Sequence, residues 1–167
     1  MSRFHLAEIN IGRLRAPVDS PILADFVANL DGINALADGA PGFVWRLVGE
    51  GNNATDIQPD AADPMMAVNM SVWTDPQALG AFVYRSDHQP IMRRRKEWFE
   101  RMREAPIVLW WVRKGHRPSI SEAIAKLQLL RAQGPTAEAF TFRHAFAPPD
   151  APQSRSPFAF GDECPAT

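Results

Sequence analysis

The sequence of 167 residues predicts an α+β fold of the split βαβ, ferredoxin-like kind with an antiparallel sheet, and three observations lead to it. The expected elements run strand, helix, strand and then repeat that order. Residues 65–73 and 107–112 are apolar or small at nearly every position, whereas a strand with one wet face alternates polar and apolar residues. A further helix signal follows the second unit. We therefore expect a sheet covered on both faces, with a helix and a strand appended.

The first strand-helix-strand unit occupies residues 4–48. Residues 4–11 read as a strand, and a helix begins near Ser20 and Pro21, where a capping side chain precedes a proline whose missing amide costs little. The helix ends at the glycine and proline residues of 39–42, and residues 43–48 form the second strand.

The second unit begins after a polar loop, residues 50–64, which we expect to be mobile and which is a candidate lid. The strand 65–73 follows this loop. Asp75 and Pro76 open a short helix, and Ser86 and Asp87 cap a second helix that runs to about residue 102. The apolar strand 107–112 completes the unit.

The C-terminal part adds a helix, a strand and a tail. Ser119 and Glu122 form a capping box for a helix that Gly134 ends. Residues 139–146 read as a last strand, with three phenylalanines on one side. Residues 1–146 are expected to form one domain, and the proline-rich residues 147–167 a loosely ordered tail.

The strand-helix order predicts a partner as well as a fold. In a split βαβ unit the helices lie on one face of the sheet, and the other face must meet another apolar surface. A second copy of the same sheet is the simplest such surface, so we expect a homodimer.

Composition excludes several classes of function. The apolar fraction of 46%, the charged fraction of 22% and the net charge of −1 are those of a globular protein with no general attraction to nucleic acid or anionic membrane. Residues 1–5 lack an apolar signal region, and no apolar run approaches the roughly 20 residues of a membrane span. Cys164 is the single cysteine, which excludes an internal disulfide and a multi-thiolate zinc site. We expect a cytoplasmic protein.

Several stretches resemble an uncharacterised bacterial family, a domain of unknown function within the dimeric α+β barrel superfamily. The resemblance covers residues 4–146 and rests on five runs: Val68-Asn69-Met70-Ser71-Val72-Trp73, Phe82-Val83-Tyr84-Arg85-Ser86-Asp87-His88, Arg93-Arg94-Arg95, Glu97-Trp98-Phe99 and Leu109-Trp110-Trp111-Val112. It implies a monooxygenase-like, dimeric barrel that binds small molecules, and fold likeness alone assigns no reaction.

The same superfamily includes cofactor-free monooxygenases, muconolactone isomerases, haem-degrading monooxygenases and other haem enzymes. The haem degraders use a first-strand asparagine, a helix tryptophan and a histidine. Asn10 and His88 resemble two of these, but Phe82 or Val83 stands at the tryptophan position. This departure counts against haem cleavage.

The predicted helix after Ser86 carries two candidate catalytic residues. His88 and Arg95 are seven positions apart, which places them within about 20° on the face that packs against the sheet. His88 is a candidate acid or base, with haem ligation and a structural hydrogen bond as alternatives. Arg95 needs a carboxylate, carbonyls or an anionic ligand if it is buried. If the helix begins at Pro90, His88 falls outside this projection.

Two strand asparagines and three aromatic residues complete the candidate site. Asn69 is a candidate oxyanion donor and Asn10 a substrate-binding residue, and the alternative for each is a core amide with satisfied hydrogen bonds. Trp73, Tyr84 and Trp111 are candidates for the substrate-binding wall, although tryptophans more often belong to a core or interface.

These residues lead to one functional hypothesis and two alternatives. We expect a cofactor-independent monooxygenase, or an isomerase-type proton-transfer enzyme, acting on a small hydrophobic, aromatic or polyketide-like metabolite. His88 would move the proton while Arg95 and Asn69 hold the oxyanion. The alternatives are a haem-binding protein or haem enzyme, and a non-catalytic dimeric ligand-binding module. No spacing indicates a metal site.

Overall fold

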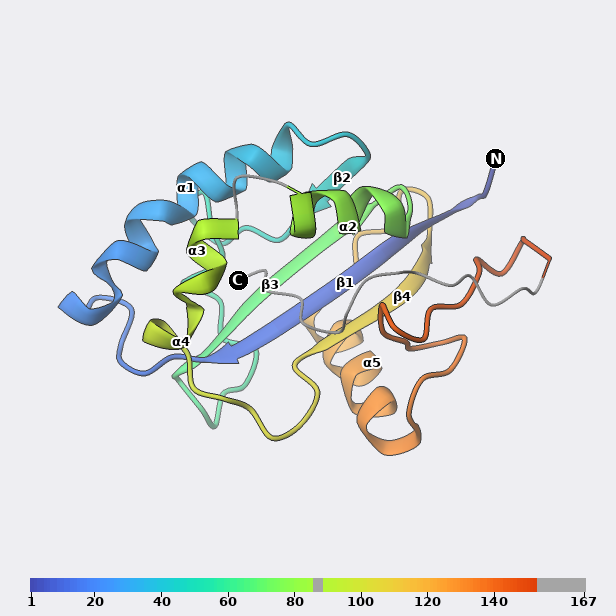
Figure 1. Cartoon of the computed structure of the whole chain (residues 1–167). Helices are drawn as coiled ribbons and strands as arrows, with labels where there is room; N and C mark the ends of the chain where they lie inside the picture. The colour runs from blue at the N-terminus through green and yellow to red at the C-terminus, as the bar shows by residue number, and fades with distance from the viewer. Residues whose placement is uncertain (86–88, 153–167) are drawn as a thin grey trace.

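A computed structural model describes residues 1–85 and 89–152, and its centre is a single four-stranded sheet (Figure 1). The strands are β1 (Phe4–Arg13), β2 (Phe43–Arg46), β3 (Met66–Trp73) and β4 (Ile107–Arg113). The helices are the 3-10 turn η1 (Pro21–Leu23), α1 (Ala24–Asp38), α2 (Pro76–Arg85), α3 (Gln89–Arg93), α4 (Arg95–Trp98) and α5 (Ile120–Gln133).

The sheet has the strand order β2-β3-β1-β4, and every neighbouring pair is antiparallel. With α1 between β1 and β2 and α2 between β3 and β4, this is the split βαβ, ferredoxin-like arrangement. The predicted α+β fold class is confirmed. The expected start signals hold too, since Ser20 and Ser119 accept hydrogen bonds from the amides of Ile22 and Glu122.

One face of the sheet is covered by α1 and α2. Its central apolar residues are Leu6, Trp73 and Leu109, from three different strands, and they pack against helix residues such as Ile33 and Leu79. The short helices α3 and α4 lie near the C-terminal end of β1, as Figure 1 shows.

The other face is covered by α5, and here the sequence-based expectation of helices on one face was wrong. Ala123, Leu127 and Leu130 of α5 pack on the apolar side chains that β1, β3 and β4 present on this side. Those strand residues are at most 7% exposed in the single chain: Ala7, Ile9, Ile11, Val68, Met70, Val72, Val108, Trp110 and Val112. The single chain thus buries both faces of the sheet. The homodimer remains a prediction, but the need to cover an apolar face of the sheet no longer supports it.

The predicted helix from Ser86 to residue 102 is also wrong in its extent. Helix α3 ends at Arg93, and α4 is a separate turn that ends at Trp98. Phe99 is extended and bridges Leu14, because the backbone here pairs with the end of β1: the Arg15 amide donates to the Trp98 carbonyl and the Glu100 amide to the Arg13 carbonyl, each at 2.8 Å.

Instead of the predicted strand 139–146 there are isolated bridges, between Phe140 and Leu109 and between Ala139 and Thr136. The chain then turns, with the Thr141 hydroxyl accepting a hydrogen bond from the His144 amide. The beginning of the expected tail is anchored, since Asp150 accepts hydrogen bonds from the Ser2 hydroxyl at 2.8 Å and the Arg3 amide at 2.6 Å. In the part of the chain that the structure describes, no helix has the length and apolar character that crossing a bilayer requires.

Candidate functional site

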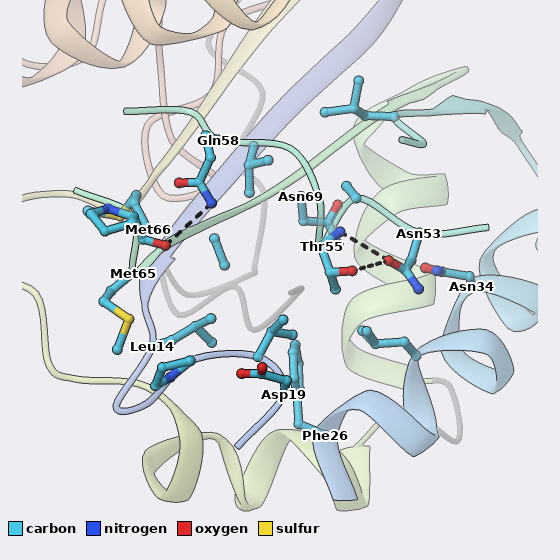
Figure 2. A pocket seen from close by; sticks show the side chains of 18 of the residues that line it. Leu14, Asp19, Phe26, Asn34, Asn53, Thr55, Gln58, Met65, Met66 and Asn69 are labelled. Carbon is cyan, nitrogen blue, oxygen red and sulfur yellow. Dashed lines mark hydrogen bonds between the residues drawn. The ribbon is translucent and has the colours of Figure 1, made fainter. Parts of the chain in front are cut away.

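A pocket of about 450 Å³ opens beside the free edge of β3. Strand β2 pairs only with the C-terminal half of β3, from Ser71 to Trp73, so Met66 to Asn69 have no strand on their outer side. The pocket is bounded by these β3 residues, by Phe26, Leu30 and Asn34 of α1, and by the loop that follows β2 (Figure 2).

The loop between β2 and β3 is fixed at its first half. The Arg46 guanidinium donates to the Asp38 carboxylate at 2.8 Å and to the Asn52 carbonyl at 2.7 Å, which ties the loop to the end of α1. Gly49 lies against the Asp56 carboxylate, which caps the Glu50 amide at 2.8 Å, and a Cβ on Gly49 would collide with that carboxylate. The loop that the sequence marks as a candidate lid forms one wall of the pocket.

Beyond the polar end of this pocket lies a smaller inner chamber of about 20 Å³. Asn34, Arg46 and Asn69 line both cavities. The chamber lies between α1 and the sheet, and its other walls are apolar except for Glu8 and Ser71: Ile33, Ala37, Phe43, Trp73, Leu79 and Phe82.

The inner chamber contains a buried carboxyl group, that of Glu8 on β1. Glu8 is 1% exposed, and its Oε1 accepts a hydrogen bond from the Ser71 hydroxyl at 3.1 Å. The Trp73 indole donates to the same hydroxyl at 2.8 Å, so the Ser71 proton is directed at Glu8. Among the described residues, Glu8 Oε2 has no hydrogen-bond partner.

Burial changes the acid–base behaviour of Glu8. Removal from water disfavours the charged form and raises the pKa of Glu8 to about 8, and the Ser71 hydrogen bond opposes only part of this effect. Arg46 is the other charged residue that lines the chamber, and its charge is paired with Asp38. At neutral pH both forms of Glu8 are accessible, which is the condition for general acid–base work.

Asn69 and Trp73, two of the predicted site residues, line the chamber. Asn69 is half-buried, and its side chain makes no hydrogen bond within the described residues. Asn10 lies directly opposite Asn69 in the β1–β3 pairing and is fully buried. These three residues share the face under α1 and α2 with Glu8.

Arg95, the first residue of α4, lies beside Gly12, which is further along β1 than Glu8. A Cβ on Gly12 would be 2.6 Å from the Phe99 ring and 3.2 Å from the Arg95 guanidinium, so glycine permits this close approach. The guanidinium is also 4.9 Å from the centre of the Phe99 ring. Arg95 is therefore on the predicted face, but it does not line the two cavities.

Tyr84 and Trp111 do not contribute to either cavity. The Tyr84 ring packs edge-on against Phe142. The Trp111 indole donates to the Phe146 carbonyl at 2.8 Å, which holds the segment after α5 against β4. Both positions belong to the core rather than to the pocket wall. His88, the predicted acid–base residue, lies outside the described residues.

Glu8 and Asn34 are the residues that the sequence reasoning missed. Glu8 stands between Leu6 and Asn10 at every second position of β1, so the alternation already placed an acid on the covered face. Asn34 lies one turn after Leu30 on the buried stripe of α1. No group of three or more His, Cys, Asp or Glu side chains within the described ranges is arranged to hold a metal ion.

Two solved structures share part of this fold at low similarity. One is a protein of unknown function from Nitrosomonas europaea, with a TM-score of 0.43, 15% identity and coverage of 70% of this chain and 95% of that chain. The other is a proposed antibiotic biosynthesis monooxygenase from Chloroflexus aurantiacus J-10-fl, with a TM-score of 0.38, 16% identity and coverage of 70% and 98%. No curated protein matches the chain.

A family model gives a direct assignment. The model described as Domain of unknown function (DUF3291) matches residues 5–156, which is nearly the whole chain. The predicted resemblance to an uncharacterised family is thereby confirmed, and the chain belongs to the DUF3291 family.

Proposed function

We propose that this member of the DUF3291 family is an enzyme that moves a proton on a small, largely apolar molecule, with Glu8 as the acid–base group. The observation that carries the proposal is the inner chamber, where a buried carboxyl with an unpartnered oxygen lies behind an apolar pocket. A titratable group with a strongly raised pKa in a cleft is a frequent mark of a catalytic site.

The outer pocket suits a small ligand with one polar end. Its volume of about 450 Å³ lies in the range of small-molecule sites. Leu14, Phe26 and Leu30 supply apolar walls, whereas Asn34 and Asn69 place amide groups at the inner end. A ligand would enter with its polar group toward Asn69 and leave its apolar body between α1 and the loop.

The chemistry that fits this arrangement is deprotonation beside a carbonyl group. The carbon loses a proton, which ends on the Glu8 carboxylate, and the C–H electron pair forms the enolate, whose charge rests on the carbonyl oxygen. The Asn69 amide donates a hydrogen bond to that oxygen. In a carbonyl compound whose α-carbon is next to a double bond, the enolate is a dienolate, and return of the proton from Glu8 to its far carbon completes an isomerisation with no atom or electron gained or lost.

Cofactor-free oxygenation, the reaction expected first from the sequence, would begin with the same proton removal and then consume dioxygen. An oxygen electrode separates the two reactions. Haem binding depended on His88 as an axial ligand, and a haem titration followed at the Soret band tests it. A non-catalytic binding module would bind ligand and release it unchanged.

Hydrogen–deuterium exchange into 2-tetralone, a flat ketone with acidic protons beside its carbonyl, tests the proposal. Proton NMR in deuterated buffer should show exchange above the solvent rate, rising with pH and levelling above a midpoint near 8, as Glu8 ionises. Glu8→Gln should lower the catalysed rate by about a hundredfold.

The matched control is Glu50→Gln, the same change on an exposed loop residue outside the pocket lining. It should keep the wild-type rate. Retention of full exchange in Glu8→Gln would remove Glu8 from the mechanism.

A further inference from the structure

The two cavities are arranged in series, and Glu8 belongs only to the inner one. The outer pocket and the chamber meet at Asn34, Arg46 and Asn69, and Glu8 does not line the outer pocket. Glu8 is on β1, one strand inward from Asn69 on β3, and its direct neighbour across the pair is Ser71. No hydrogen bond joins Glu8 to Asn69 within the described residues, where the Glu8 carboxyl accepts one from Ser71 and its Oε2 has no partner.

The chamber is too small for part of a ligand but large enough for water. Its volume of about 20 Å³ leaves room for a water molecule. A buried water also needs at least two polar partners. Glu8 Oε2 and the amides of Asn34 and Asn69 supply them, while Ile33, Phe43 and Phe82 close the remaining sides.

We infer that one water molecule in this chamber relays the proton between Glu8 and the ligand, and that Asn69 is the positioning residue for both. The inference rests on the proposed function. In the relay, the water gives a proton to the Glu8 carboxylate and takes one from the ligand, so water is regenerated and one proton has moved. Asn69 holds the water on one side and the ligand oxygen on the other.

Filling the chamber tests this relay separately from Glu8. Ala37 of α1 lines the chamber but not the outer pocket, so Ala37→Val places two methyl groups where the water would lie. Ala35→Val is the matched control, because Ala35 is on the exposed side of the same helix. The readouts are 2-tetralone affinity, by titration calorimetry, and 2-tetralone exchange, by NMR.

Ala37→Val should bind 2-tetralone within about twofold of the wild type but exchange its protons at least about tenfold more slowly. Ala35→Val should change neither. If Ala37→Val exchanges at the wild-type rate while Glu8→Gln does not, the relay is wrong and Glu8 acts directly. If the wild type itself gives no exchange, the proposed function fails and the relay with it.

A second measurement on the wild-type chain covers the case in which Ala37→Val does not fold. Nuclear Overhauser spectra of labelled protein should show a cross-peak between the Ala37 methyl group and a long-lived water. Absence of that cross-peak, with the methyl resonance assigned, would overturn the relay.

Discussion

The two faces of the sheet are built from the same strands but carry different kinds of residue. On the face under α1 and α2, β1 presents Glu8 and Asn10, and β3 presents Asn69 and Ser71. These polar side chains lie in the middle of the sheet rather than at its rim. The face under α5 presents apolar side chains from β1, β3 and β4.

This difference separates chemistry from packing. Buried polar groups cost stability unless they have partners, so the mostly apolar α5 face serves mainly stability, although it also carries His5, whose Nδ1 is buried without a hydrogen-bond partner among the described residues. On the opposite face, Glu8 keeps a raised pKa and an unpartnered oxygen, a state that a purely structural residue would not need. The comparison makes three predictions, which differ in the size of their effect.

The largest effect is on the pH dependence of stability. The raised pKa means that folded Glu8 keeps its proton up to pH about 8, whereas in the unfolded chain it loses it near 4.5. As the pH rises between these two values, the free energy of unfolding should therefore fall, by on the order of 4 kcal/mol. Urea denaturation at pH 5 to 9 should show this fall, and Glu8→Gln should remove most of it.

His5 works in the opposite direction. Burial lowers the pKa of His5, so its contribution to stability is lost as the pH falls and rises with pH. His5 is present in both proteins, and the difference between wild type and Glu8→Gln cancels it. An equal pH dependence in the two proteins would mean that Glu8 titrates normally.

The second effect is confined to the packing face. Leu127→Ala removes a side chain of α5 that is 1% exposed and should lower the free energy of unfolding by about 3 kcal/mol. Because α5 lies on the far side of the sheet, 2-tetralone exchange by the folded variant should be unchanged. Gln128→Ala, an exposed change on the same helix, is the control. Loss of exchange in folded Leu127→Ala would show that the two faces are coupled.

The smallest effect on stability is expected at Asn69. Its side chain makes no hydrogen bond within the described residues, so Asn69→Ala should change the free energy of unfolding by no more than about 0.5 kcal/mol. Loss of a ligand hydrogen bond should weaken 2-tetralone binding by about fivefold to tenfold. Asn29→Ala, outside the pocket lining, should leave calorimetric affinity unchanged. Unaltered affinity in Asn69→Ala would place the ligand elsewhere.

Local signals in the sequence determined most of the fold. The caps at Ser20 and Ser119 and the apolar runs of β3 and β4 were sufficient, because hydrogen bonds to caps and burial of both faces act over short stretches. The expected helix from Ser86 ends early because the backbone of residues 98–100 pairs with residues 13–15, which the local helical pattern does not encode. That is a tertiary effect.

The sequence pattern also could not predict what covers the second face of the sheet. A helix after β4 was expected, but its apolar residues do not state which face of the sheet they meet. A second copy of the chain was expected on that face because the appended helix had not been placed on the sheet. In the structure, α5 covers that face instead.

The site was predicted in part. Asn69 and Trp73 were identified because a polar residue or a tryptophan in an apolar strand needs a partner. The pocket itself depends on how the loop after β2 folds back through Arg46 and Asn52, which no periodicity encodes. Glu8 was visible in the alternation of β1, and its significance became clear only with its burial.

Carbon-detected NMR of the Glu8 side-chain carboxyl through a pH titration tests the central claim most directly, with Glu8→Gln providing the assignment. A midpoint near 8 is the predicted result, since α1 and the sheet keep that carboxyl away from water. A midpoint near 4.5, the ordinary value for glutamate, would show that water reaches the carboxyl. Glu8 would then not be an acid–base group for neutral pH on the face under α1 and α2.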